Sequence, residues 1–167
     1  MSLLRNAREN EGPKYENIPE LVMPKRSRSK ISCYILDTNA VLILLQDEPG
    51  ATAVQRLISR AKSNNCRLIM SIISLGEMYY IIYERRGRID ATKALTYIES
   101  LPIEMLTAKR KVTLQAAEIK ATKNLGYADS FVVACALTED GRVVTGDPDF
   151  KKADDIIHIR WLIGRAS

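Results

Sequence analysis

From Ile31 onward, short apolar runs alternate with longer segments in which apolar residues recur every three or four positions. Short apolar runs are typical of buried strands, and the wider spacing is typical of helices that pack one face against a core. The pattern predicts strands over residues 32–36, 67–71, 103–106, 142–145 and 156–159. It predicts helices over residues 38–46, 51–62, 75–85, 90–100, 112–123 and 129–138. This alternation favours one α/β domain with a largely parallel central sheet.

The first 30 residues lack this regular pattern. They contain three prolines and end in the basic run Lys25-Arg26-Ser27-Arg28-Ser29-Lys30. Polar, proline-containing segments bury too little apolar surface to fold alone. We therefore predict a flexible basic extension over residues 1–30 and a globular domain over residues 31–167. The extension is either an arm that binds RNA or a partner, or an addition upstream of Met23 as an alternative start.

Composition restricts the class of protein. The chain has 167 residues, 46% of them hydrophobic, and its 25 basic against 20 acidic residues give a net charge of +5. A basic balance is compatible with nucleic acid, an acidic partner or a membrane surface. Cys33, Cys66 and Cys135 lack the spacing of a disulfide framework or a zinc site. Because no apolar run is long enough to span a bilayer, we expect a soluble, cytoplasmic protein with no membrane partner.

Four acidic residues stand where one predicted element gives way to the next: Asp37, Glu77, Asp129 and Asp147. In α/β domains, functional groups gather at the carboxyl ends of parallel strands, so the four acids are expected to meet. Each also has an ordinary explanation, since Asp37 and Asp129 suit helix starts and Asp147 suits a turn. Glu77 follows Ser74 at the spacing of a capping box.

A cluster of carboxylates can bind a divalent metal ion. Carboxylate oxygens are the ligands that Mg²⁺ and Mn²⁺ prefer, and a bound metal ion relieves the repulsion between them. Such an ion also polarises a phosphoryl oxygen and activates water, as phosphodiester hydrolysis requires. The sequence therefore predicts a metal site that uses the four acids. Thr145, Asn39 and, less strongly, Asp149 are candidates to support it through hydrogen bonds, or they serve as ordinary strand and turn residues.

Basic and histidine residues narrow the chemistry further. His158 is the only histidine, which argues against a Ser-His-Asp triad and against a multi-histidine zinc site. Basic groups on predicted helices are candidates to neutralise RNA phosphates, and a solvated helix surface is the alternative. These candidates are Arg85, Arg86, Lys109, Arg110, Lys111, Lys120 and Lys123.

Four short motifs, in this order, resemble those of the PIN-domain ribonucleases, and most closely the VapC toxins of toxin–antitoxin pairs. The motifs are Leu36-Asp37-Thr38-Asn39, Ser74-Leu75-Gly76-Glu77, Gly126-Tyr127-Ala128-Asp129-Ser130-Phe131-Val132-Val133-Ala134 and Val144-Thr145-Gly146-Asp147-Pro148-Asp149-Phe150. The resemblance extends over about residues 32–163. The 30-residue leader departs from it, because such toxins commonly begin close to the first strand.

The resemblance implies a three-layer α/β/α sandwich and a Mg²⁺- or Mn²⁺-dependent endoribonuclease, a hydrolase of RNA phosphodiester bonds. It implies that Asp37, Glu77, Asp129 and Asp147 are the catalytic, metal-binding acids. Thr38 or Asn39, Thr145 and Asp149 then support them. It further implies frequent homodimers and a cognate antitoxin that obstructs the acidic pocket, for which an apolar groove would serve.

Two alternative functions come from other classes. In the first, the protein is a haloacid-dehalogenase-like phosphatase with Asp37 as its nucleophile. Asn39 weakens this alternative because such enzymes usually have a second aspartate there. In the other, the protein is a non-catalytic PIN-like module that binds RNA or protein, and the presence of all four acids argues against such a loss of catalysis.

Overall fold

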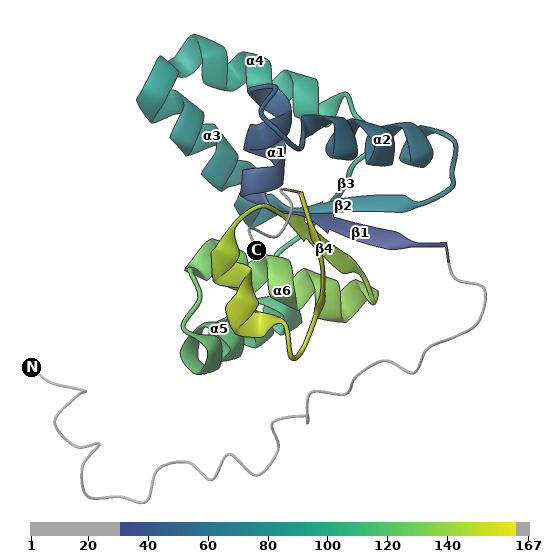
Figure 1. The fold of residues 1–167 in the computed structure, drawn as a ribbon. Helices are drawn as coiled ribbons and strands as arrows, with labels where there is room; N and C mark the ends of the chain where they lie inside the picture. The colour runs from purple at the N-terminus through teal and green to yellow at the C-terminus, as the bar shows by residue number, and fades with distance from the viewer. Residues whose placement is uncertain (1–30, 163–167) are drawn as a thin grey trace, which may run out of the picture.

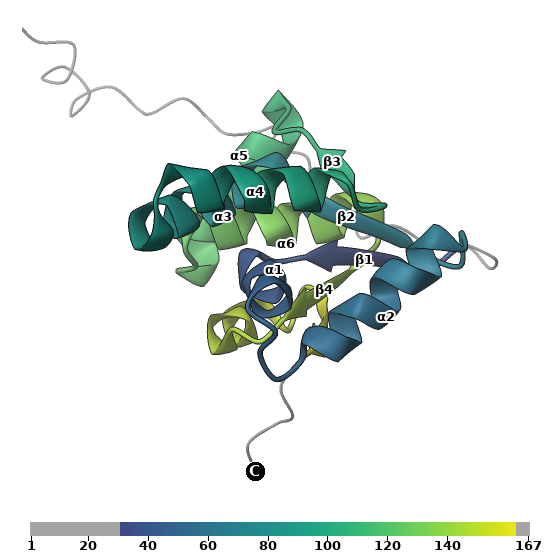
Figure 2. The ribbon, with the colours of Figure 1, turned by 90° about the horizontal axis from the view of Figure 1, so that it is seen from above.

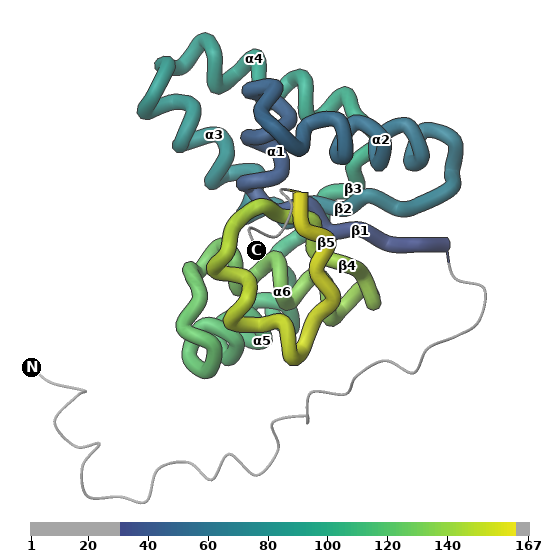
Figure 3. The backbone as a smooth tube through the Cα atoms, in the orientation of Figure 1, coloured from purple at the N-terminus to yellow at the C-terminus, as the bar shows by residue number. Residues whose placement is uncertain are grey.

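A computed structural model describes residues 31–162, which form a parallel sheet between two layers of helices (Figure 1). The five strands are β1 (Cys33–Leu36), β2 (Arg67–Ser71), β3 (Glu104–Leu106), β4 (Arg142–Thr145) and β5 (His158–Trp161). They lie in the order β3-β2-β1-β4-β5, and each neighbouring pair is parallel. Figure 3 shows β5 beside β4 at one end of the sheet. The predicted α/β/α sandwich with a parallel sheet is therefore confirmed.

The central strand β1 ends at the same edge of the sheet as its two neighbours. Leu36 at its end pairs with Met70 on one side and with Val144 on the other. Because all the strands are parallel, the segments that follow β1, β2 and β4 leave the sheet at the same edge. Beyond the last paired residue, the Asp37 amide still donates a hydrogen bond of 3.2 Å to the Val144 carbonyl.

Helices cover both faces of the sheet. Their bounds are α1 (Thr38–Leu45), α2 (Ala51–Lys62), α3 (Ile72–Arg86), α4 (Arg88–Glu99), α5 (Arg110–Lys123) and α6 (Tyr127–Glu139), with a 3₁₀ helix η1 (Pro148–Ala153). Helices α1 to α4 lie on one side of the sheet, and α5, α6 and η1 lie on the other (Figures 1 and 2). The sheet is therefore buried on both faces, as its nearly continuous apolar strands require.

Alternation along β1 produces two separate cores. Ile35 packs with residues of α5 and α6, whereas its neighbour Leu36 packs with residues of α1, α2 and α3. Both side chains are fully buried. Successive side chains of a strand point to opposite faces, so a single strand can anchor both layers of helices.

Several predicted boundaries were wrong by one to three residues, and two of these differences have a clear physical reason. Helix α3 begins at Ile72, three residues earlier than predicted, because the Ser71 hydroxyl caps it by accepting the Ile73 amide at 3.1 Å. The last strand begins at His158, two residues later than the predicted 156, since Ile157 is buried in the core beneath η1.

Two further predictions concern the N-terminal extension and the absence of a membrane span. The predicted extension, residues 1–30, lies outside the described residues. Among residues 31–162, no helix is both long enough and apolar enough to cross a membrane.

Candidate active site

The four predicted acids stand around the edge where the parallel strands end. Asp37 follows β1 directly, and Asp147 comes two residues after β4. Glu77 lies in the second turn of α3, and Asp129 in the first turn of α6. Helix α3 contacts both α1 and α6, so the elements that carry the four acids pack against one another.

Thr145 joins Asp37 to Asp147. Its hydroxyl donates a hydrogen bond of 2.8 Å to Asp37 Oδ2 and accepts one of 2.9 Å from the Asp147 amide. Thr145 and Asp37 are both buried, with exposed fractions of 0% and 2%. The threonine therefore fixes the orientation of the Asp37 carboxylate and the path of the chain into η1.

Asn39 and Asp149 complete this side of the site. Asn39 Oδ1 accepts a hydrogen bond of 2.9 Å from the Gly146 amide, which ties α1 to the segment after β4. Asp147 caps η1 by accepting the Asp149 amide at 2.9 Å. The structure thus places Asn39, Thr145 and Asp149 beside the acids that they were expected to support.

Glu77 has a specific partner across the site. The Thr38 hydroxyl donates a hydrogen bond of 2.6 Å to Glu77 Oε2. The alternative explanation of Glu77, a capping box with Ser74, is wrong because α3 begins at Ile72 and is capped by Ser71. Glu77 therefore has no part in the start of its helix, and its carboxylate faces α1.

Asp129 is held at the start of α6. Its carboxylate accepts a hydrogen bond from the Gly126 backbone, so the expected role at a helix start is present. A Cβ at Gly126 would come within 2.5 Å of Asp129 Oδ2, which means that only glycine leaves room for this arrangement. The glycine before α6 is thus part of the site.

Burial and mutual repulsion raise the pKa values of two of these acids. The pKa of Asp37 rises to about 7, mainly through burial and further through the nearby carboxylates of Asp129 and Glu77. The Thr145 hydrogen bond opposes this rise. The pKa of Asp129 rises to about 6, again first through burial and then through Glu77 and Asp147. Among residues 31–162, no ion pair with a lysine or arginine neutralises any of the four acids.

This donor set fits a hard divalent cation. Within the described residues, no three acidic, histidine or cysteine side chains form a ready-made cage for a metal ion. Mg²⁺ does not need one, because one or two protein carboxylates suffice when water and substrate phosphate supply the other oxygens. Asp37, with its buried and unneutralised carboxylate, has the chemistry of such a ligand.

The predicted basic residues at the two ends of α5 form two groups. Lys109, Arg110 and Lys111 lie at the start of α5, about 20 Å of helix from the loop that leads to Asp129. Lys120 and Lys123 lie near that loop: Lys120 Nζ donates to the Leu125 carbonyl at 3.1 Å, and Lys123 pairs with Asp155. The structure therefore brings only this second group towards the acids.

Sequence reasoning missed Lys152, whose position the fold alone reveals. Its Nζ lies 3.0 Å from Asp149 Oδ2 and 3.5 Å from the Asn124 carbonyl. It therefore places a positive charge between η1 and the loop before α6. Its two neighbours lie 3 and 28 positions away along the chain, and only the nearer contact could have been inferred from spacing.

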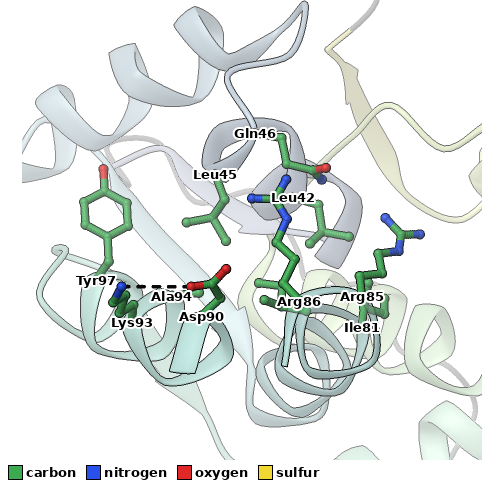
Figure 4. A pocket seen from close by; sticks show the side chains of 11 residues that line it. Leu42, Leu45, Gln46, Ile81, Arg85, Arg86, Asp90, Lys93, Ala94 and Tyr97 are labelled. Carbon is green, nitrogen blue, oxygen red and sulfur yellow. Dashed lines mark ion pairs between the residues drawn. The ribbon is translucent and has the colours of Figure 1, made fainter. Parts of the chain in front are cut away.

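A second feature lies apart from the acids. Helices α1, α3 and α4 enclose a groove of about 320 Å³ (Figure 4). Its lining includes the apolar side chains of Leu42, Leu45 and Ala94. Arg85 and Arg86 from α3 stand beside it, so its surroundings are basic.

These features, a parallel α/β/α sandwich with four acids at the carboxyl edge of its sheet, define a class of domain. Residues 34–156 match the family model of the PIN domain. The chain therefore belongs to the PIN-domain family, as its four motifs predicted. A search among curated proteins returned no match.

Solved structures share the fold at low sequence identity. VapBC2 of Rickettsia felis, bound to a promoter DNA fragment, is 20% identical with a TM-score of 0.61, over 77% of this chain and 97% of that one. VapC20 of Mycobacterium tuberculosis, a sarcin–ricin loop cleaving toxin, is 17% identical with a TM-score of 0.57, over 72% and 94%. A toxin–antitoxin complex from Klebsiella pneumoniae is 13% identical with a TM-score of 0.57, over 78% and 98%.

Proposed function

We propose that this protein is an endoribonuclease that depends on Mg²⁺ or Mn²⁺. The observation that carries the proposal is Asp37, a buried carboxylate without a basic partner among the described residues, which interacts with the carboxylates of Asp129 and Glu77. Membership of the PIN family supports nuclease chemistry over the phosphatase alternative. VapC20, which shares the fold, is described as an RNA-cleaving toxin and supports RNA as the substrate.

Each residue of the site has a proposed task. Asp37, Asp129 and Asp147 hold the metal ion, and Glu77 either holds it or orients the attacking water. Thr38 fixes the Glu77 carboxylate, and Thr145 fixes that of Asp37. When bound, the ion supplies an activated water and stabilises charge on the phosphoryl oxygens. Because the pKa of Asp37 is raised to about 7 and that of Asp129 to about 6, a metal ion would compete with protons for these acids, and its affinity should rise with pH.

Replacing Asp37 by asparagine tests this function. The substitution keeps the shape of the side chain and an oxygen for the Thr145 hydroxyl, but removes the charge that attracts metal. We expect the variant to fold and to lose cleavage of RNA in the presence of Mn²⁺. Asp47→Asn is the matched control, since Asp47 is exposed in the loop after α1 and its φ of 52° suits asparagine equally well. Undiminished cleavage by the Asp37 variant would refute the assignment.

We also propose that the protein is the toxin of a toxin–antitoxin pair, with the groove as the docking site of the antitoxin. Several structures with this fold are toxin–antitoxin complexes. The apolar lining and adjacent arginines suit a peptide that combines apolar anchors with acidic residues. A homodimer, which the family resemblance implies, is part of the same proposal.

Co-expression with the product of the adjacent gene tests the proposed partner. Ala94→Trp would fill the groove, so we expect it to prevent co-purification while RNA cleavage continues. Thr92→Trp, at an exposed position of α4 outside the groove lining, is the control and should leave co-purification intact. Equal recovery of the adjacent gene product with both variants would place its binding site elsewhere.

A further inference from the structure

One aromatic side chain is exposed beside the acidic site. Tyr127 is the first residue of α6, and 49% of its surface is accessible. Its ring meets that of Phe131 edge to face, with centroids 5.1 Å apart and an interplanar angle of 88°. Phe131 is only 2% exposed and belongs to the core under α6. The buried ring therefore braces the exposed one, which limits its freedom to move.

Tyr127 lies two residues before Asp129, an acid of the proposed site. Ideal helix geometry places their Cα atoms about 5.4 Å apart. The two side chains leave the helix in different directions, because Tyr127 packs towards Phe131 whereas the Asp129 carboxylate turns back to Gly126. A nucleotide with its phosphate at the acids can thus have its base, or that of its neighbour, beside the Tyr127 ring.

A cation stands on the same side of the site. Lys152 Nζ is 3.5 Å from the carbonyl of Asn124, in the loop that leads directly to Tyr127. It also forms an ion pair of 3.0 Å with Asp149, two residues after Asp147. A charge in this place can neutralise a backbone phosphate that runs from the acidic site towards the tyrosine.

We propose that Tyr127 stacks against an unpaired base of the RNA substrate, next to the phosphate that is cut. This inference rests on the proposed nuclease function and adds a residue that positions the substrate beside the acids. A base held in a duplex has both faces covered by its neighbours, whereas an unstacked base presents a free face to an aromatic ring. The Tyr127 ring would therefore hold a base only where that base is unstacked from its neighbours.

Fluorescence of 2-aminopurine tests the stacking directly. The probe is a short single-stranded RNA that carries 2-aminopurine, and the protein is the full chain with Asp37→Asn, so that binding is measured without cleavage. We expect the protein to quench the probe. Adding Tyr127→Leu, which keeps an apolar contact with Phe131, should abolish the quenching and weaken binding about tenfold. Tyr127→Phe should retain both, because stacking needs the ring and not the hydroxyl.

Controls separate this inference from the function on which it rests. Tyr83→Leu changes a comparably exposed tyrosine, 48% accessible on α3 and also in contact with a second ring, and should leave quenching unchanged. Thermal melts of each variant would reveal a merely structural effect of Tyr127. If the wild-type chain cleaves RNA but Tyr127→Leu neither lowers quenching nor raises KM, stacking is refuted while the nuclease stands. If the wild-type chain does not cleave RNA, yet quenching requires the Tyr127 ring, stacking is supported while the nuclease function is refuted. Absence of quenching by every form overturns the proposal.

Discussion

At the scale of single residues, Asp37 combines two properties that oppose stability. Its carboxylate is buried, and the charges of Asp129 and Glu77 repel it. A charge in such a place is costly unless a counter-charge compensates it, and the Thr145 hydroxyl compensates only in part. Positions of this kind persist when function requires them, which is consistent with a metal ligand.

The raised pKa of Asp37 predicts how stability depends on pH in metal-free protein. The folded chain holds this proton up to about pH 7, whereas the unfolded chain releases it near the ordinary value of 3.8. Between these values the folded state binds more protons, so the free energy of unfolding falls as pH rises, by up to about 1.4 kcal/mol per pH unit. Asp37→Asn removes this contribution and should be more stable than the wild type at pH 8.

Thermal melts in chelator at pH 5 and pH 8 measure this difference. The wild-type melting temperature should be lower at pH 8 than at pH 5. The melting temperature of Asp37→Asn should decrease less over the same range. The melting temperature of Asp37→Asn should still decrease somewhat, because burial and the nearby carboxylates also raise the pKa of Asp129, to about 6. Asp47→Asn, which alters an exposed acid, should follow the wild type. Parallel pH profiles for wild type and Asp37→Asn would show that the Asp37 carboxyl titrates normally.

At the scale of elements, the start of α6 leaves room for the Asp129 carboxylate because Gly126 has no side chain. We predict that Gly126→Ala reduces metal-dependent cleavage on the order of 100-fold, because the new Cβ displaces the Asp129 carboxylate. The backbone at Gly126, with φ of −57° and ψ of 155°, is one that alanine also adopts, so stability should change little.

Gly76→Ala is the matched control for that substitution. Gly76 precedes Glu77 within α3, and a Cβ there would meet nothing within 4 Å. Alanine at this helical position should raise stability by about 0.5–1 kcal/mol and leave cleavage unchanged. Equal activity of the two variants in a Mn²⁺-dependent cleavage assay would contradict a positioning role for Gly126.

The sequence predicted most elements well where periodicity and boundary residues agreed. Helix α2 and strand β2 have the predicted bounds, since a clear apolar face and the Asn64-Asn65 turn mark them. The start of α3 was missed because Ile72 and Ile73 are apolar and β-branched like a continuing strand, and only the cap made by Ser71 marks the start of the helix.

The site shows the same limit on prediction. The four acids could be found in the sequence because they stand where one element gives way to the next. They could be expected to lie together because the ends of parallel strands meet at one edge of the sheet. The roles of Lys152 and of the Tyr127 ring depend on contacts across the fold, with Asn124 and Phe131, that no local pattern specifies. Partners of this kind follow from tertiary packing and not from spacing.

At the scale of the whole molecule, the two proposed binding surfaces lie on different elements. The acids and Tyr127 surround the carboxyl edge of the sheet, whereas the groove lies between α1, α3 and α4. Helices α1 and α3 contribute to both, since Thr38 and Glu77 precede Leu42 and Arg85 on the same two helices. A partner in the groove therefore contacts the helices that hold the Thr38–Glu77 hydrogen bond, which gives an inhibitor a physical route to the site.

The basic segment of residues 1–30 supports a prediction about affinity rather than catalysis. It holds seven basic and four acidic residues, so it supplies +3 of the net charge of +5. Every proposed catalytic residue lies between positions 37 and 149. We therefore expect a chain that begins at residue 31 to retain the kcat of Mn²⁺-dependent cleavage within about twofold, but to bind RNA more weakly. Its affinity should also depend less on salt, because each lost phosphate contact removes about 0.7 from the slope of log K against log salt for a single strand.

A full-length variant separates charge from length in this experiment. Replacing Lys25, Arg26, Arg28 and Lys30 with glutamine keeps the segment but removes the basic run. If charge is the cause, this variant and the shortened chain should lose affinity and salt dependence alike, with kcat preserved in both. A shortened chain that folds but no longer cleaves would show that the first 30 residues take part in catalysis. Unchanged affinity and an unchanged salt slope would show instead that RNA is held by the domain alone, through cations such as Lys152.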